Sequence, residues 1–292
     1  MNRTLVGILC GLGAASIWGG MYVVSKVVLE IIPPFTLVSI RLLLGALTLL
    51  IVLLVRGFPK ISRQQSLQVL GIGFVGYGIS LSLQFLGTKM STAANGSLVT
   101  SATPAFVLIF AWLLLRERIT PLRLTSLVLA TLGVIAVIDP RSARLNPELF
   151  LGNVALIGAA ITWALYSVLV RKGTQNLEVL PFSLIAFLGG LPVTVPAGAW
   201  EAGTIGIGDV TLGVIGGILF LGVISTALAM VLWNTAFALV DASLASLTFF
   251  AQPVVGTLLG WLFLGEQVTP LFLLGGFLIG LGLVIASREP SV

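Results

Sequence analysis

Histidine is absent from the 292-residue sequence, and cysteine occurs once, at Cys10. The lack of histidine excludes histidine-based metal sites, Ser-His catalytic pairs and histidine proton relays. A single cysteine allows neither an internal disulfide nor a cysteine-rich metal site. Charge is scarce as well: Asp, Glu, Lys and Arg make up 9% of the residues, against about 25% in ordinary soluble domains. We expect no cofactor, no metal and no enzyme activity.

Apolar residues, by contrast, make up 58% of the chain, and its mean hydropathy is +1.15. A soluble fold of this size could not bury so much apolar surface, so we expect the surrounding solvent to be lipid. The net charge of +5 does not indicate nucleic-acid binding, because the basic residues are scattered between apolar runs. The N-terminal run resembles a signal peptide, but it continues from Arg3 to Val24 and is long enough for a retained first helix.

Long apolar segments predict an all-α membrane protein. About 20 mostly apolar residues are needed for a helix to cross the hydrocarbon core of a bilayer. Short polar breaks divide this chain into ten such segments. The predicted spans are residues 5–25, 34–55, 66–87, 93–115, 121–138, 150–170, 179–199, 211–233, 241–264 and 269–287.

Lys and Arg predict the orientation of these spans. If the N-terminus is cytoplasmic, ten basic residues lie on the inner side and four on the outer side, while Arg41 lies within the second span. This excess favours cytoplasmic N- and C-termini. The inner set is Arg3, Arg56, Lys60, Arg63, Arg116, Arg118, Arg123, Arg171, Lys172 and Arg288, and the outer set is Lys26, Lys89, Arg141 and Arg144.

The chain also repeats itself. The stretch TPAFVLIFAWLLLRERITP begins at Thr103, and QPVVGTLLGWLFLGEQVTP begins 149 residues later at Gln252. Closer to the N-terminus the matching stretches are 145 residues apart: GAASIW ends at Trp18 and GAAITW ends at Trp163. The first five predicted spans therefore correspond to the last five, which predicts two repeats, residues 1–145 and 146–292.

Five spans are an odd number, so the second repeat would lie upside down relative to the first. The charges agree with this, because the basic loops 56–63 and 116–123 correspond to loops of the second half that lack Lys and Arg. Corresponding loops on opposite faces of a membrane obey opposite charge rules. Inverted repeats of this kind are a recurring plan of secondary transporters that work by alternating access to a central site.

Four stretches carry a family resemblance: SIWGGMYVVSK, PPFTLVSIRLLLGAL, TPAFVLIFAWLLLRERITPLRLTSLVLATLGVIAVI and LASLTFFAQPVVGTLLGWLFLGEQVTPLFLLGGFLIGLGLVI. Together they resemble the ten-helix EamA-type members of the drug/metabolite transporter superfamily, over almost the whole chain. Within that group the chain is most similar to YddG-type bacterial amino-acid exporters. The resemblance implies ten helices in two inverted repeats around a central cavity, and export of amino acids, other metabolites or drugs.

One departure from the superfamily concerns energy coupling. Its four-helix multidrug members carry a membrane-embedded glutamate in the first helix, which binds protons and cations. Residues 6–24 contain no carboxylate here, and neither does the matching stretch of the sixth span. The chain also lacks a Walker sequence for ATP hydrolysis. We therefore predict a facilitator driven by the solute's own gradient.

Two prolines at matching positions indicate where the transport site lies. Pro104 falls near the middle of the fourth span and Pro253 near the middle of the ninth. A proline inside a helix removes a backbone hydrogen bond and bends the helix, and the freed carbonyl needs a polar partner or water in a cavity. The prediction is a pair of gating bends, and the alternative is a structural kink with no substrate nearby.

Polar and aromatic side chains near these prolines form the candidate substrate site. Trp18 and Trp163 hold matching mid-span positions, while Tyr77, Ser80 and Gln84 fall on one helical stripe. Polar groups within lipid turn inward, to neighbouring helices or to a wet cavity. Hydroxyl groups can instead bond their own helix backbone. The candidate substrate-binding residues are Trp18, Tyr22, Tyr77, Ser80, Gln84, Asn95, Trp163, Tyr166, Phe249 and Gln252.

Arg41 is a charge at membrane depth, which makes it a functional candidate by default. It either contacts a substrate carboxylate or merely snorkels to a helix end and ties down carbonyl groups there. Trp112 and Trp261 also match, but they lie near span ends beside Glu117 and Glu266 and are typical of interface anchors.

These features predict a multi-pass transporter of the bacterial inner membrane that functions as a monomer. Aromatic rings, amides and hydroxyls suit a small neutral or zwitterionic solute with an apolar part, and amino acids fit best, aromatic and apolar ones included. One alternative is a multidrug exporter that moves lipophilic cations in exchange for protons. A more remote alternative is a membrane sensor or scaffold that transports nothing.

Overall fold

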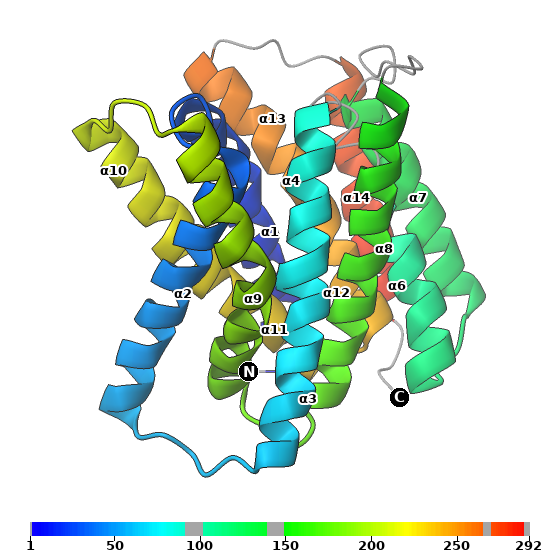
Figure 1. The fold of residues 1–292 in the computed structure, drawn as a ribbon. Coiled ribbons are helices and arrows are strands. Elements are labelled where there is room, and N and C mark those ends of the chain that lie inside the picture. The colour runs from blue at the N-terminus through cyan, green and yellow to red at the C-terminus, as the bar shows by residue number, and fades with distance from the viewer. Residues whose placement is uncertain (1, 91–101, 139–148, 265–269, 289–292) are drawn as a thin grey trace.

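A computed structural model describes residues 2–90, 102–138, 149–264 and 270–288. Every regular element in these ranges is a helix, and the helices pack side by side in one bundle (Figure 1). The predicted all-α architecture is therefore confirmed for the described part of the chain.

The first half of the chain contains eight described elements, which are α1 (Arg3–Val28), α2 (Pro34–Arg56), α3 (Arg63–Gly73), the π-helical segment η1 (Phe74–Ser80), α4 (Leu81–Met90), α6 (Thr103–Phe110), the π-helical segment η2 (Ala111–Leu115) and α7 (Pro121–Ile138). The second half contains α8 (Phe150–Gly173), α9 (Val179–Ile205), α10 (Leu212–Leu219), the π-helical segment η5 (Phe220–Leu228), α11 (Ala229–Leu239), α12 (Ala242–Leu247), the 3₁₀ turn η6 (Thr248–Phe250), α13 (Ala251–Leu264) and α14 (Pro270–Ser287). Consecutive elements such as α3, η1 and α4 follow one another without a break and form one long rod.

Helix ends are fixed by local chemistry and by neighbouring helices. Pro34 and Pro121 begin α2 and α7, where the missing N–H of proline would have no helical partner in any case. The start of α2 is also capped from outside: the backbone N–H of Thr36 donates to the buried carboxylate of Glu201 in α9, at 3.0 Å. A carboxylate at a helix N-terminus satisfies an otherwise unpaired donor and complements the helix dipole.

Six described helices are long and apolar enough to cross a membrane, and four shorter apolar helices have 10–17 residues. Their outward faces carry large apolar side chains, such as Leu54 and Val55, which expose 69% and 83% of their surface. Such faces suit contact with lipid tails. The chain is a membrane protein, as predicted, while the count of ten crossings stays a prediction.

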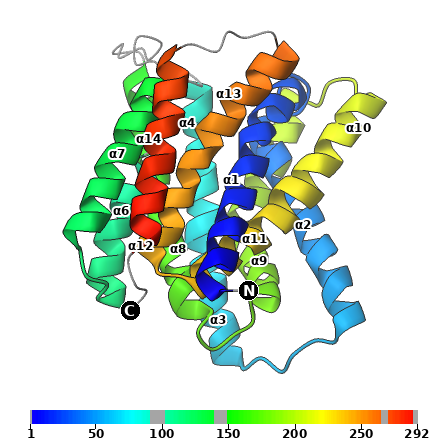
Figure 2. The ribbon, with the colours of Figure 1, turned by 180° about the vertical axis from the view of Figure 1, so that it is seen from behind.

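The helix contacts recur in pairs under the same sequence shift that relates the two halves. Helix α1 packs against α11 and α13, and its counterpart α8 packs against α4 and α6. The two most extensive contacts join counterparts directly: α2 packs against α9, and α7 against α14. Figures 1 and 2 show α7 and α14 together at one edge of the bundle.

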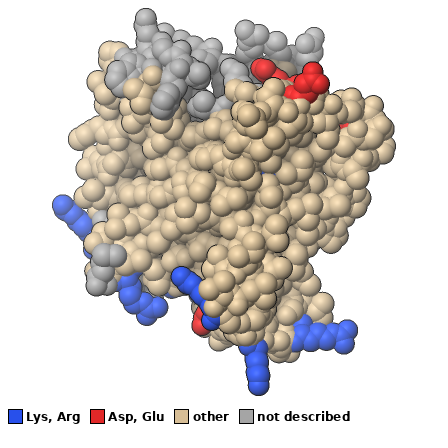
Figure 3. Space-filling view, turned by 90° about the vertical axis from the view of Figure 1, so that its left-hand side faces the viewer, with Lys and Arg blue, Asp and Glu red and all other residues tan. Residues whose placement is uncertain are grey.

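The two termini lie at the same end of the bundle. Helix α1 begins and α14 ends at the lower end in Figures 1 and 2. Lys and Arg side chains gather toward this end in the face that Figure 3 shows. This charge distribution is typical of a cytoplasmic surface. We call this the termini end below.

Close backbone approach holds α7 against α14. A Cβ atom added to Gly133 would lie 2.7 Å from the carbonyl oxygen of Gly275, and one added to Gly282 would lie 2.8 Å from that of Ser126. Small residues at such points let helices approach in lipid, where van der Waals packing drives association. These two positions therefore require glycine.

Gly133→Ala should lower the midpoint of thermal unfolding in detergent by a few degrees, because overpacking of this kind costs about 1–3 kcal/mol. Gly280→Ala is the matched control on α14, where an added Cβ meets no atom within 4 Å. Equal melting temperatures for the two variants would contradict the α7–α14 contact.

Candidate functional site

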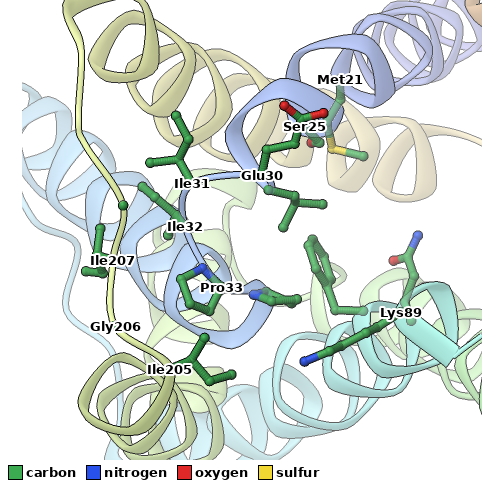
Figure 4. Close-up of a pocket in the computed structure, with 15 residues that line it drawn as sticks. Met21, Ser25, Glu30, Ile31, Ile32, Pro33, Lys89, Ile205, Gly206 and Ile207 are labelled. Atoms are coloured by element: carbon green, nitrogen blue, oxygen red, sulfur yellow. The ribbon is translucent and has the colours of Figure 1, made fainter.

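A wide cavity opens at the end of the bundle opposite the termini. It has a volume of about 640 Å³ and is walled by the end of α1, the turn into α2, the end of α4 and the end of α9 (Figure 4). The backbone N–H of Gly208, after α9, donates to the carbonyl of Ile31 in the α1–α2 turn at 2.9 Å, which ties two of these walls together. Charged side chains at its rim come from Glu30 and Lys89. We call this cavity the vestibule.

A smaller pocket continues from the floor of the vestibule toward the middle of the bundle. It has a volume of about 50 Å³ and shares Met21, Gln84 and Phe85 with the vestibule. We call it the inner pocket. Its other lining residues are Trp18, Arg41, Ser80, Leu81, Thr103, Ala159, Ala160, Trp163, Met230, Phe249 and Gln252.

The structure brings together seven of the residues singled out from the sequence. They come from five different rods of the bundle, and one of them is the buried Arg41. This convergence places the polar side chains of separate spans around a single hollow. The seven are Trp18, Arg41, Ser80, Gln84, Trp163, Phe249 and Gln252.

Aromatic rings form one side of the inner pocket. The ring of Trp18 lies 6.0 Å from that of Trp163 and 6.2 Å from that of Phe249, in edge-to-face arrangements. Trp233, which the sequence analysis did not propose, lies 5.3 Å from Trp18. The indole N–H of Trp18 donates to the backbone carbonyl of Ser225 at 3.0 Å. This hydrogen bond and the ring contacts fix the orientation of Trp18.

Tyr77 and Tyr166 do not line the inner pocket. Their hydroxyl groups hydrogen-bond to each other, Tyr166 donates to Asn234 at 3.0 Å, and Asn234 donates to Ser183 at 2.9 Å. All four side chains are buried. The two tyrosines therefore belong to a polar network that joins four rods, and their predicted contact with a substrate stays a prediction. Polar groups in a bundle core are satisfied by one another as readily as by a cavity.

Arg41 stays inside the bundle, with 5% of its surface exposed. Its Nε atom donates to the hydroxyl of Thr226 at 3.3 Å, and its Nη2 atom donates to the hydroxyl of Ser225 at 3.4 Å and to the sulfur of Met21 at 3.1 Å. The guanidinium group lies at the inner pocket rather than at the membrane surface. Of the two interpretations of Arg41, this geometry favours a role at the pocket over snorkelling.

Several buried polar atoms remain without a hydrogen-bond partner. Among the described residues five side-chain N or O atoms are in this condition, and three of them belong to residues that line the vestibule or the inner pocket. The three are the hydroxyl of Ser25, the indole N–H of Trp163 and Oε1 of Gln252. A buried unsatisfied polar group costs about 1–3 kcal/mol. A donor and an acceptor at the inner pocket are thus available to a solute or to water.

Two π-helical segments shape this region, and neither was predicted from the sequence. Segment η1 carries Tyr77 and Ser80, while η5 carries Ser225 and Thr226, which hold Trp18 and Arg41. The hydroxyl of Thr226 donates to the carbonyl of Leu221, five residues earlier, which the wider π turn permits. π-Helical turns are rare and often occur at functional sites. The sequence carried one signal for η5, because the adjacent polar residues Ser225 and Thr226 interrupt an otherwise apolar span.

The prolines and the remaining candidates have different outcomes. Pro104 lies in the first turn of the described α6, next to the pocket residue Thr103, and the residues before it, 91–101, lie outside the described ranges. Pro253 follows the 3₁₀ turn η6, so the ninth span changes its helical form just before the proline. Asn95 lies outside the described residues, as does the side chain of Tyr22. The gating role predicted for the two prolines and the substrate contacts predicted for Asn95 and Tyr22 stay predictions.

An all-helical membrane bundle with an amphipathic pocket below an open vestibule is the architecture of a membrane transporter. The chain belongs to the EamA-like transporter family, whose model matches it twice, at residues 5–138 and 150–288. The family-level resemblance noted in the sequence is therefore confirmed, and the function shown for the family is transport.

Individual relatives agree with this assignment. The uncharacterized transporter YoaV of Bacillus subtilis is 23% identical, with 97% of this chain and 96% of that protein covered. The uncharacterized transporter YetK of the same organism is 27% identical, with 89% of this chain and 81% of that protein covered. A solved crystal structure superposes with a TM-score of 0.80 at 21% identity, covers 96% of each chain and thus shows the same fold.

Trp163→Ala should reduce solute flux in proteoliposomes about tenfold, which corresponds to about 1.4 kcal/mol of lost binding. Trp112→Ala is the matched control, because Trp112 has 53% of its surface exposed and does not line the inner pocket. It should leave flux nearly unchanged. Equal losses in two variants that are correctly folded would remove Trp163 from the site.

Proposed function

We propose that this protein is a secondary transporter of amino acids, aromatic and apolar ones included, of the YddG type. It moves them across the bacterial inner membrane by alternating access, as an exporter or an uncoupled facilitator, and it functions as a monomer. The observation that carries this proposal is the buried guanidinium of Arg41 beside aromatic rings and unpaired amide and indole atoms.

Each part of an amino acid has a complementary group at the inner pocket. The cationic Arg41 provides charge-assisted hydrogen bonds for the carboxylate. Oε1 of Gln252 accepts a hydrogen bond from the ammonium group, and the faces of Trp18 and Trp163 add cation–π attraction. The rings of Trp18 and Phe249 form the apolar surface for the side chain. A lipophilic cation, the solute of the multidrug alternative, has no carboxylate for Arg41 and would not use all of these groups.

Size determines how such a solute enters. The inner pocket has a volume of about 50 Å³, well below the roughly 300–1,000 Å³ of ordinary small-molecule sites. An amino acid therefore binds only when the pocket widens or when part of the solute extends into the vestibule. The shared residues Gln84 and Phe85 line both hollows and are the contacts that a bound solute would displace.

Several observations support an inverted repeat with ten spans. The family model matches each half separately, and helix contacts recur under the shift that relates the halves. Residues 1–145 and 146–292 are accordingly proposed as the two repeats. Both termini lie at the end of the bundle where basic side chains gather, so we assign that end to the cytoplasm and the vestibule to the outer side.

The rival candidate is a multidrug exporter that exchanges lipophilic cations for protons. The positive charge of Arg41 at the inner pocket opposes it, because like charges in a poorly hydrated site repel strongly. A cationic pocket favours a solute that brings a carboxylate. The uncoupled mechanism rests on the sequence, in which residues 6–24 hold no carboxylate.

Replacement of Arg41 should separate solutes by their carboxylate. In counterflow with a panel of labelled amino acids, Arg41→Gln should reduce exchange at least tenfold, while Arg41→Lys should retain part of it because the charge remains. Competition by an amino acid should exceed competition by its decarboxylated amine in the parent protein, and this preference should shrink in Arg41→Gln. An amine preference in the parent protein would support the multidrug alternative instead.

Energy coupling is tested by imposing ion gradients on proteoliposomes. We expect solute flux down its own gradient to continue at the same rate with no pH difference across the membrane, because no carboxylate or histidine is available in the first span as a proton carrier. A flux that stops when the pH gradient is collapsed would rule out the uncoupled mechanism.

A further inference from the structure

The hollows of the molecule follow one another from the vestibule to the termini end. The vestibule of about 640 Å³ leads to the inner pocket of about 50 Å³, which includes Thr103. The next residue, Pro104, lines a space of about 10 Å³ whose other walls include Ser246, Arg123 and Asp241. Arg123 and Asp241 also line a fourth hollow of about 230 Å³ at the termini end. These hollows form a series toward the termini end, and the smallest of them lies between Pro104 and the charged pair.

A cluster of ion pairs occupies the far side of this narrow point. Nη2 of Arg123 contacts the carboxylate of Asp241, and Nη1 of Arg123 lies 3.1 Å from the carboxylate of Glu117. Arg171 lies 3.8 Å from Asp241 and also donates to the carbonyl of Ala238 at 2.8 Å. Arg123 and Asp241 expose only 7% and 4% of their surface. We call Glu117, Arg123, Arg171 and Asp241 the inner latch.

The inner latch joins the two halves of the chain. Glu117 and Arg123 belong to the first half, and Arg171 and Asp241 to the second. Glu117 also accepts hydrogen bonds from the backbone N–H groups of Ala242 and Ser243, at 2.8 and 3.2 Å, so a carboxylate from one half caps the first turn of α12 in the other. Separation of the halves at this end would break the Arg123–Asp241 ion pair and the hydrogen bonds from α12 to Glu117, whereas the Glu117–Arg123 and Arg171–Asp241 pairs each lie within one half.

Local backbone geometry directs Glu117 toward α12. The π-helical segment η2 ends at Leu115, and the next residue, Arg116, adopts the left-handed conformation with φ of 59°. The N–H of Glu117 then donates back to the carbonyl of Ala111 at 3.1 Å, which turns the chain sharply. A non-glycine residue in this conformation is uncommon and often marks a functional constraint.

We propose that the inner latch is the gate that closes the transport route at the termini end, and that its release opens the route there as the vestibule closes. Ion pairs suit this task because their groups are satisfied in both states. They bond to one another when the gate is closed and dry, and to water when it is open. The proposal rests on alternating access in the proposed function, but not on the identity of the solute.

Single-cysteine reporters test the gate without any solute. In a Cys10→Ser background, Ser246→Cys reports access to the narrow point, and Ser25→Cys reports access to the vestibule. Ser167→Cys is the control for general loosening, because Ser167 is fully buried and bonded to Trp233 away from these hollows. Each is treated with a membrane-impermeant maleimide in lipid nanodiscs, where both faces of the protein are accessible.

Asp241→Asn should raise the labelling rate of the Ser246→Cys reporter at least fivefold and lower that of the Ser25→Cys reporter, with the Ser167→Cys reporter unchanged. The double variant Arg123→Asp with Asp241→Arg should restore part of the original pattern. Lys172→Gln is the matched control, because Lys172 is an exposed cation at the same end and outside the latch.

Two results would overturn the gate. One is unchanged labelling at Ser246→Cys in Asp241→Asn, and the other is a rise at all three reporters together, which indicates loosening rather than gating. If Asp241→Asn fails to fold, Glu117→Gln replaces it, since it weakens the same cluster and keeps the side-chain volume. Failure of amino-acid counterflow would leave these labelling results intact, so the two proposals stand or fall separately.

Discussion

The absence of water in the hydrocarbon core is the constraint on which this structure depends. Every polar group that enters the core must find a partner inside the bundle or in a hollow. Trp18 bonds a backbone carbonyl, Tyr77 and Tyr166 bond each other, and Arg41 bonds two hydroxyls from η5. The groups that remain unpaired gather mainly at the vestibule and the inner pocket. The arrangement of helices and the chemistry of the pocket thus follow from one requirement.

The same constraint explains why the two ends of the route differ. At the vestibule end the walls are mainly apolar residues of the α1–α2 turn and the end of α9, with Glu30 and Lys89 at the rim. At the termini end, buried carboxylates and guanidinium groups are brought together and hold the halves in contact. Charged side chains can be buried there because each has an opposite charge and several hydrogen bonds. The pocket between these ends is consequently reached from one side.

Several residues that line the inner pocket could be singled out from the sequence, whereas their exact neighbours could not. Trp18, Gln84, Trp163 and Gln252 were recognised as large polar or aromatic residues in apolar spans, and they do meet at one pocket. Tyr166 satisfied the same criteria, yet it faces another polar network. Helical periodicity gives the face on which a side chain lies, but not which neighbour that face meets. The π-helical segments were also missed, because adjacent polar residues such as Ser225 and Thr226 mark an interruption of an apolar span but do not show that its helix has a π turn.

By itself the sequence determined that this chain is a membrane protein, that its described part is helical and which family it belongs to, while the relation of its two halves as repeats stays a proposal. Composition and the spacing of polar breaks suffice for these conclusions, because each reports a property of single segments or of their order. Only the tertiary structure decided which polar groups were left unpaired and that Glu117, Arg123 and Asp241 form one cluster. Those outcomes depend on contacts between residues more than 100 positions apart, and such contacts exist only after the helices have packed.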